Sequence, residues 1–435
     1  MENQNNNREP LIRQLSVWGI WLLAVNGMIG AGIFGVPAGA AEHTGIYSPL
    51  IFLGCGILLT AVVLCFAELS SYFRGTGGPI LYIREAFGPL AGFQTGWAFY
   101  IARVTAFAAN INLLVASIAF FWEPADEGFV RILMLGLIVL LLAWPNLMGT
   151  RYGMRSLGVL TLLKFLPLLA VVVMGMVLFE PDAFPVRETS FPDAISIGTA
   201  ALLVIYAFVG WEAAVVPAGE TRDPARTMPK ALLLAMGMVT LLYVLVQVVV
   251  VGTLDDPAAT ERPLVEVGSV LFGPVGAVLL TAGVVVSVGG NIAGTVITAP
   301  RLTYSLARDG SLPAWFGRVH EERRTPNNSI IFFAILVFVL SVYGSFVWLA
   351  AMSALVRVLI YMACIGAMPR LRRRHGDHPD RFRLPGGWAI PGGAFLVSGL
   401  LLFQVELFSV AVTAAFLLAG AVLYWWVRRS RGVTE

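Results

Sequence analysis

Charge is scarce in this chain of 435 residues. Asp, Glu, Lys and Arg make up 13% of it, compared with roughly 25% in soluble domains, while hydrophobic residues reach 58%. This composition excludes an ordinary soluble protein. The three cysteines all lie in apolar runs, so no disulfide framework is indicated. No nucleotide-binding loop, metal cluster or nucleophile–base set is present, which disfavours an enzyme or a primary pump and predicts neither a cofactor nor a metal site.

Long apolar runs dominate the sequence instead. A helix needs roughly 20 apolar residues to cross a bilayer, and the runs predict an all-α polytopic membrane protein with twelve transmembrane helices. The predicted spans are 16–40, 46–71, 90–121, 129–147, 157–179, 195–219, 230–253, 270–300, 329–344, 346–368, 390–404 and 407–427. The polar residues 1–15 and 429–435 are predicted to be tails, and no cleavable signal peptide is expected.

The basic residues predict the orientation in the membrane. Of the 29 Lys and Arg residues, three lie inside predicted spans, and 23 lie in the termini and in loops after even-numbered spans. Basic residues concentrate on the cytoplasmic side, so both termini are predicted to be cytoplasmic. The basic stretch 370–383 directly follows a span, which favours contact with anionic lipid over nucleic acid. His375 and His378, which flank Asp377 there, indicate a solvated surface rather than a metal site.

Lys164 is one of only two lysines, and it lies within the apolar run 157–179. A lone ammonium near the bilayer centre costs about 3 kcal/mol even on mild insertion scales, so it must face protein or a water-filled path. A desolvated lysine changes its protonation state readily. We therefore expect Lys164 to carry a proton or to replace a cation. The alternative is a fixed counter-charge that locks helices together.

Glycines are dense in the first span, where Gly30, Gly32 and Gly35 match a dinucleotide-binding pattern. That fold needs a preceding strand, so its position within a span excludes it. Unwound backbone at membrane depth survives only where it lines a cavity. There a half-helix N-terminus can hold a carboxylate and freed carbonyls can hold a cation. The alternative is a small-residue face for close helix packing.

The sixth span repeats this pattern 180 residues later. Gly30 precedes Pro37 by seven residues, Gly210 precedes Pro217 by seven, and both segments close with Val-Pro-Ala-Gly. Because the offset equals five spans, the second unit must be inverted in the membrane. Paired interrupted spans at matching positions of two halves indicate a transporter's substrate site.

Three further charges lie within predicted spans. Glu212 follows the expected break in the sixth span, and it is either a proton-sensing carboxylate or a hydrogen-bond anchor for unwound backbone. Arg103 and Arg357 have no neighbour of opposite charge in the sequence. We expect structural or gating roles for both rather than contact with substrate.

These segments carry a resemblance to a known family. The most specific are GAGIF (30–34), FVGWE (208–212) and GETRDP (219–224), with RGTGGP (74–79) and RDGSLP (308–313) in support. Over roughly residues 12–430, the chain resembles the amino acid–polyamine–organocation permeases. The resemblance implies a five-plus-five inverted repeat of leucine-transporter type with broken first and sixth helices. The repeats would occupy 16–180 and 194–369, followed by two helices over 390–428.

The resemblance also implies how a substrate would bind. Its carboxylate would meet backbone N–H groups of the first break, its ammonium would meet carbonyls of both breaks, and aromatic residues of the sixth span would wall and gate the pocket. The implied substrate-binding residues are Met28, Ile29, Ala31, Gly32, Ile33, Tyr206, Phe208 and Val209. Ser287 and Asn291 are polar candidates on the eighth span.

Lys164 matches a lysine of a proton-coupled subset of these permeases, where it replaces the sodium ion of sodium-coupled relatives. This lysine sets the chain apart from the family's acid-resistance antiporters and favours symport. We therefore expect a proton-coupled amino acid transporter of the plasma membrane that works by alternating access, with Lys164 and Glu212 as the proton-coupling candidates. An amino acid exchanger or a polyamine carrier is the alternative, and a channel or membrane-embedded enzyme is remote. The scarcity of intramembrane acids favours neutral over polybasic substrates.

Overall fold

The structure is a computed structural model that describes residues 15–73, 77–148, 154–178, 190–216, 221, 223–323, 325–375 and 381–430, without the side chains of 154–162, 293, 294 and 297. Several predicted features lie outside these residues: most of both tails, part of the loop 74–79, Pro217–Gly219 at the end of the repeated segment, and Asp377 and His378. Across the described residues the chain is helical, and its only β-type pairing is an isolated bridge between Leu15 and Thr221.

The helices follow the predicted spans closely. The first half of the chain contains α1 (Val17–Met28), α2 (Gly32–Thr44), η1 (Gly45–Tyr47), α3 (Ser48–Tyr72), α4 (Pro79–Phe87), α5 (Pro89–Ala119), η2 (Glu123–Asp126), α6 (Gly128–Leu147) and α7 (Met154–Val177). The second half contains α8 (Ala194–Phe208), η4 (Trp211–Ala214), α9 (Pro224–Thr253), η6 (Pro257–Ala259), α10 (Pro263–Arg308), η7 (Ala314–Gly317), α11 (Asn327–Tyr343), α12 (Phe346–His375), α13 (Ala389–Leu402) and α14 (Leu407–Ser430).

Length and apolar composition support a membrane protein. Among the described residues, 8 helical segments are long and apolar enough to cross a bilayer, and four shorter apolar helices of 10–17 residues accompany them. The outer helices expose large apolar side chains such as Phe129, Leu140 and Val173. Since lipid takes the place of water around a spanning helix, these faces suit contact with acyl chains.

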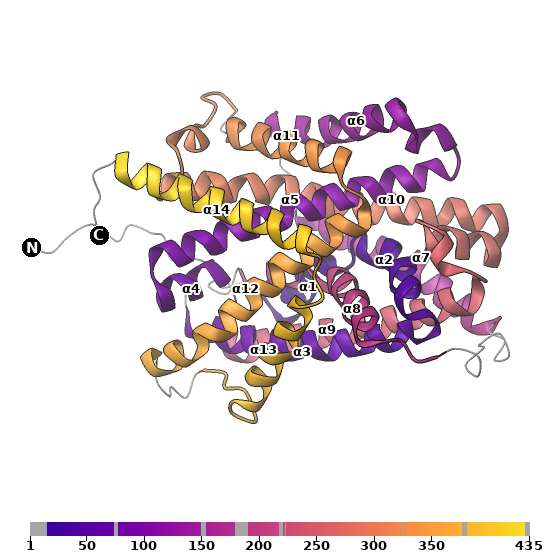
Figure 1. The fold of residues 1–435 in the computed structure, drawn as a ribbon, viewed down its shortest axis with the longest axis horizontal. Helices are drawn as coiled ribbons and strands as arrows, with labels where there is room; N and C mark the ends of the chain where they lie inside the picture. The colour runs from indigo at the N-terminus through magenta and orange to yellow at the C-terminus, as the bar shows by residue number, and fades with distance from the viewer. Residues whose placement is uncertain are drawn as a thin grey trace, which may run out of the picture.

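The two interrupted segments lie in the middle of the bundle (Figure 1). α1 packs against α9 and η4, and α2 packs against α8, which also contacts α3 and α12. α6 and α11 pack together on one side, while α3, α9 and α13 lie on the other (Figure 1). The core cluster runs through this centre and includes the fully buried Tyr243 and Trp211.

Two glycine–proline elbows join a short helix to a long one. Gly88, with φ of 93°, separates α4 from Pro89 of α5, and Gly273, with φ of 66°, bends α10 just before Pro274. Both φ values lie in the left-handed region, which glycine adopts without steric cost. Proline suits the first turn of a helix because its fixed φ is already helical. The predicted span at 270–300 therefore begins at this second elbow.

Candidate functional site

Two helix breaks form the centre of the site. α1 ends at Met28, Ile29 is extended with φ −77° and ψ 90°, and α2 begins at Gly32. α8 ends at Phe208, and Gly210 adopts a left-handed conformation with φ of 113° before the short helix η4. Both breaks fall where the glycine pattern of the sequence placed them.

Glycines at both breaks allow direct contact between backbones. A Cβ on Gly27 would lie 2.3 Å from the carbonyl oxygen of Gly210, and a Cβ on Gly210 would lie 2.2 Å from that of Gly27. A Cβ on Gly32 would lie 2.4 Å from the Cα of Ala207. Side chains at these positions would therefore force the two interrupted segments apart. Close packing and helix unwinding, which the sequence offered as alternatives, occur together.

A cavity of about 250 Å³ lies between the breaks. Its lining comes from α1, α2, α5, α8, η4, α10 and α12. The residues that surround it include Leu23, Asn26, Gly27, Met28, Gly30, Ala31, Gly32, Phe99, Arg103, Ala106, Asn110, Tyr206, Val209, Gly210, Glu212, Ala213, Asn291, Thr295, Thr298 and Arg357. Of the predicted substrate-binding set, five residues face this cavity: Met28, Ala31, Gly32, Tyr206 and Val209.

Three predicted binding residues lie behind the cavity wall instead. Ile29 and Ile33 are fully buried and are not part of the lining. Phe208, expected to gate the pocket, packs against Tyr243 with ring centroids 5.0 Å apart and against Phe52 at 6.4 Å. Its side chain leaves the helix on the side of α3 and α9, so of the two expected gating aromatics only Tyr206 faces the cavity.

Lys164 meets the C-terminal end of α1. Its side chain is fully buried, and Nζ donates to Asn26 Oδ1 at 2.9 Å, to the Ile29 carbonyl at 3.1 Å and to the Asn26 carbonyl at 3.3 Å. The last carbonyls of a helix carry partial negative charge and have no intrahelical donor. The ammonium therefore occupies a cation site that the interrupted helix creates, and it ties α7 to α1.

Other side chains satisfy the remaining carbonyls of this break. Ser287 Oγ donates to Ile29 at 3.3 Å, Tyr243 donates to Met28 at 2.9 Å, and Asn291 Nδ2 donates to Gly27 at 3.3 Å. Ser287 thus belongs to the lysine's surroundings, whereas Asn291 lines the cavity. Ile29 already accepts two hydrogen bonds, and Met28 and Gly27 accept one each, so a substrate ammonium at this break would share occupied carbonyls.

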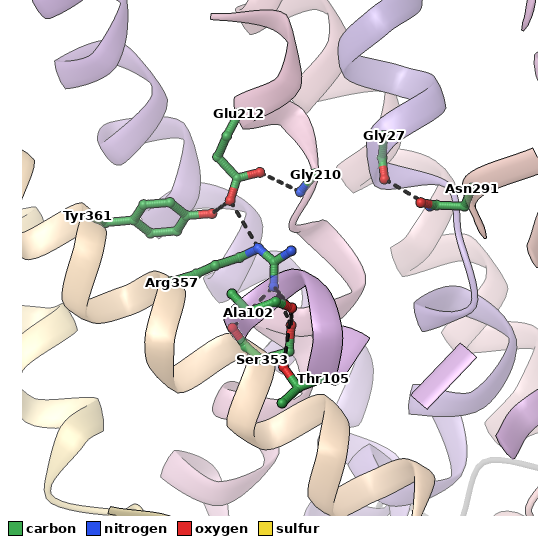
Figure 2. A network of polar contacts seen from close by, with 9 residues as sticks. All are labelled: Gly27, Ala102, Thr105, Gly210, Glu212, Asn291, Ser353, Arg357 and Tyr361. Atoms are coloured by element: carbon green, nitrogen blue, oxygen red, sulfur yellow. Dashed lines mark hydrogen bonds and ion pairs between the residues drawn. The ribbon is translucent and has the colours of Figure 1, made fainter. Parts of the chain in front are cut away.

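Glu212 anchors the unwound backbone of the second break (Figure 2). Its Oε2 accepts from the Gly210 N–H at 2.6 Å, and its Oε1 accepts from the Tyr361 hydroxyl. Arg357 Nε lies 3.3 Å from Oε1, an ion-pair distance without the angle of a hydrogen bond. The Glu212 and Arg357 side chains are 6% and 8% exposed. Glu212 therefore makes the anchoring contact that was one of its two predicted roles.

Arg357 in turn joins α12 to α5. Its NH1 donates to the carbonyls of Ala102 and Ser353 at 3.2 Å each and to the Ser353 hydroxyl. Thr105 also donates to the Ala102 carbonyl (Figure 2). No partner for Arg357 can be read from the sequence, because its carboxylate lies on a segment distant along the chain.

Arg103 is the second arginine of the cavity wall. It lies on α5, is partly buried, and donates from NH1 to Thr298 Oγ1 of α10 at 2.5 Å. Phe99, Ala106 and Asn110 line the same cavity, at spacings that put all four α5 residues on one helix face. Both intramembrane arginines therefore border the cavity that the two helix breaks form.

Aromatic side chains close one end of the cavity. Tyr206 donates to Asn110 Oδ1 at 2.9 Å and packs edge-on against Phe346, with ring centroids 6.0 Å apart. Gly35 makes room for this ring, since a Cβ there would lie 2.6 Å from it. Phe346 also borders a separate cavity of about 410 Å³ that contains Asp126. The aromatic pair thus lies between the two cavities.

The central cavity extends in the opposite direction. Its lining includes Leu23 of α1, Phe99 in the first half of α5 and Thr298 near the end of α10. These positions lie toward the end of the bundle where α1 and α5 begin and α10 finishes. The cavity therefore reaches from the helix breaks toward that end and is closed at the other by Tyr206 and Phe346.

Comparison with known proteins identifies the family. Residues 15–428 match the amino acid permease family over nearly the whole chain. The chain belongs to the amino acid permease family. This confirms the resemblance read from the glycine motifs. The matched proteins are permeases and transporters, so this chain is a transport protein and not an enzyme.

The permease is similar to transporters of several kinds. It is 26% identical to the serine/threonine exchanger SteT of Bacillus subtilis over 422 residues, which cover 94% of this chain and 95% of that protein. It is 26% identical to the branched-chain amino acid permease BcaP of the same bacterium, with 98% and 95% covered. It is 27% identical to the human large neutral amino acids transporter small subunit 2, with 83% and 70% covered.

Sequence reasoning missed several polar residues of the site. Asn26 binds the lysine, Asn110 binds Tyr206, Tyr243 satisfies the first break, and Tyr361 binds Glu212. Each lies in an otherwise apolar span, where a buried polar group needs a partner. That signal was present in the sequence, but it does not say which distant segment supplies the partner.

Proposed function

We propose that this permease carries amino acids across the plasma membrane by proton-coupled symport and alternating access. The observation that carries the proposal is the meeting of two interrupted helices, at Gly27 and Gly210, on the wall of a cavity of about 250 Å³. Broken helices of this kind hold substrate near the middle of the membrane in secondary transporters. A cavity closed at one end and extended toward the other suits a carrier better than a channel.

The first break offers complementary ends to a zwitterion. α2 begins at Gly32, and the first N–H groups of a helix have no intrahelical acceptor. Together with the positive end of the helix dipole, the N–H groups of Ala31 and Gly32, which line the cavity, suit a carboxylate. The carbonyls of Gly27, Met28 and Val209 are available to the ammonium through their second lone pairs.

An inverted repeat accounts for the arrangement of the helices. The proposed repeats span 16–180 and 194–369, followed by two more helices over 390–428, and give twelve spans in all. The elbows support this division: Phe87-Gly88-Pro89 in the first unit corresponds to Phe272-Gly273-Pro274 in the second, and both glycines have positive φ. Two separate segments, the helix break and the elbow, therefore recur at nearly the same offset.

Charge asymmetry sets the proposed orientation. With 23 of the 29 basic residues assigned to one side of the membrane, both termini would be cytoplasmic. α1 and α5 then begin at the cytoplasmic side. The central cavity extends toward that side and Tyr206 and Phe346 close the other end, so the structure would represent an inward-facing arrangement.

Lys164 is the proposed coupling group. When protonated, it holds α7 against the carbonyl end of α1 by the three hydrogen bonds described above. Loss of the proton toward the cytoplasm would remove the attraction to these carbonyls and loosen the two helices. A difference of a few kcal/mol is enough to bias a two-state equilibrium of this kind.

Exchange is the second candidate mechanism. Its support is the similarity to a protein named as a serine/threonine exchanger. A lysine that never loses its proton would leave such a carrier without a coupling ion. Polyamine transport fits less well, because two arginines and one carboxylate border the cavity and a polycation would meet a positive wall.

Uptake into proteoliposomes tests the proposal. A panel of amino acids should be accumulated when the outside is acid, and sodium should have no effect. Lys164→Ala should lose accumulation against a gradient while residual exchange can survive, because the backbone site is untouched. Lys230→Ala is the matched control, since this lysine is exposed at the start of α9. Accumulation that survives in Lys164→Ala would move the coupling role to Glu212.

A further inference from the structure

The charges on the cavity wall are not balanced. Among the lining residues, two carry a full positive charge, Arg103 and Arg357, and one carries a negative charge, Glu212. Lys164, just behind the wall, adds another positive charge and is held by carbonyls rather than by a carboxylate. Charge buried in a membrane protein is expensive unless a partner compensates it. On the wall itself, Arg103, Arg357 and Glu212 leave one positive charge for a ligand to compensate.

The carboxylate of Glu212 is committed to its existing contacts. It accepts from the Gly210 N–H and the Tyr361 hydroxyl, and its ion-pair partner is Arg357. Arg357 also donates to the Ala102 carbonyl and to Ser353. Glu212 and Arg357 therefore pair with each other and join three helices, so neither is free to bind a substrate.

Arg103 is arranged differently. A guanidinium carries five N–H donors, and the described contacts of Arg103 use one of them, to Thr298 at 2.5 Å. Its other nitrogens are not among the buried polar atoms that lack a partner, which indicates that they face the open cavity. The hydroxyl of Thr298 holds one guanidinium nitrogen of Arg103 and leaves the other N–H donors available to a planar anion.

The position of Arg103 fits the side chain of a bound amino acid. Asn110, two helical turns along α5 and about 10 Å away by helix rise, contacts Tyr206 at the closed end of the cavity. Arg103 lies on the same face toward the open end. A substrate whose backbone groups sit at the breaks would direct its side chain along this face.

We infer that the cavity selects amino acids with a carboxylate side chain and that Arg103 is the residue that recognises it. The inference rests on the proposed function, because it assumes that the amino acid binds between the two breaks. An amino acid of net charge −1 would balance the wall residues Arg103, Arg357 and Glu212. The bidentate pairing of guanidinium and carboxylate would distinguish it from its carboxamide analogue.

Ligand-induced stabilisation of the purified protein tests the inference. Glutamate and aspartate should bind about 10- to 100-fold more tightly than glutamine and asparagine, the range expected for a charge-assisted hydrogen-bonded pair. Dissociation constants would come from the concentration dependence of the thermal midpoint, since a ligand of the folded state raises it. Serine, leucine and lysine complete the panel.

Variants of Arg103 separate recognition from folding. Arg103→Gln should reduce the ratio of glutamate to glutamine affinity to near one while glutamine affinity is kept, and Arg103→Lys should restore part of the ratio. Arg226→Gln, which alters an exposed arginine at the start of α9, should leave the ratio unchanged. If Arg103→Gln does not fold, the parent protein's glutamate-to-glutamine ratio still decides the question.

The outcomes distinguish this inference from the proposed function. Tighter binding of glutamine or a neutral amino acid than of glutamate by the parent protein would overturn the role of Arg103 and leave amino acid transport standing. A preference for glutamate that Arg103→Gln retains would also overturn it. If no amino acid binds or is transported, the proposed function and the inference fail together.

Discussion

Removal of the Glu212 carboxylate is expected to destabilise the protein strongly. Glu212→Gln keeps an oxygen for the Gly210 N–H but leaves Arg357 as a buried charge without its ion-pair partner. Breaking a buried ion pair from one side costs about 3–5 kcal/mol, because the other charge remains desolvated. The exposed pair between Glu85 and Arg374, with side chains 41% and 62% exposed, is the matched control. Glu85→Gln should cost about 0–1 kcal/mol.

Unfolding of detergent-solubilised protein, followed by tryptophan fluorescence, measures both effects. The double variant Glu212→Gln/Arg357→Met should recover a large part of the loss, because it removes both charges together. The Ala102 carbonyl would keep its hydrogen bonds from Ser353 and Thr105. A loss for Glu212→Gln no larger than that for Glu85→Gln, or a double variant less stable than the single one, would refute the assignment of this pair as an anchor.

Two further predictions concern orientation and the second break. An impermeant thiol reagent applied to intact cells should label Asp126→Cys but not Arg373→Cys, because the basic residues predict that Arg373 is cytoplasmic; the reverse pattern would invert the topology. Gly210→Ala should prevent folding, since its φ of 113° disfavours other residues and its Cβ would lie 2.2 Å from the Gly27 carbonyl oxygen. Gly237→Ala, with nothing within 4 Å of the added carbon, should leave the stability unchanged or raise it by up to about 1 kcal/mol. Equal yields of folded Gly210→Ala and Gly237→Ala would contradict the close contact between Gly27 and Gly210.

Local patterns predicted the helices and both breaks. Each apolar run became a helix or a pair of helices, and the boundary at Gly344 and Ser345 separates α11 from α12 as expected. Gly30 and Gly210 marked the interruptions because unwinding depends on the residues at the break itself. The eight long apolar segments and four shorter helices are compatible with twelve spans, a count that stays a prediction.

Contacts between distant segments could not be read in the same way. The pairing of Glu212 with Arg357 depends on how α12 lies against η4, and no local pattern reports that. Phe208 was expected at the cavity because it neighbours the break, but the helix directs its ring toward Phe52 and Tyr243 instead. Adjacent residues of a helix point in different directions, so closeness in sequence did not establish a place in the site.

The sequence carries a second signal for the proposed repeat. The tripeptide Phe-Gly-Pro occurs at 87–89 and again at 272–274, and both copies form an elbow. In each, the short helix folds back on the long one: a Cβ on Gly92 would lie 2.6 Å from the Arg84 side chain, and a Cβ on Gly276 would lie 1.9 Å from the Gly268 carbonyl oxygen.

Substrate protection of a single cysteine tests the central claim, that amino acids bind in the cavity between the two breaks. Ala213 is exposed and lines this cavity, while the three native cysteines are buried. In Ala213→Cys, a saturating amino acid that stabilises the protein should slow thiol labelling several-fold, and it should leave labelling of Lys230→Cys unchanged. Labelling of Ala213→Cys at the same rate with and without that amino acid would contradict the account.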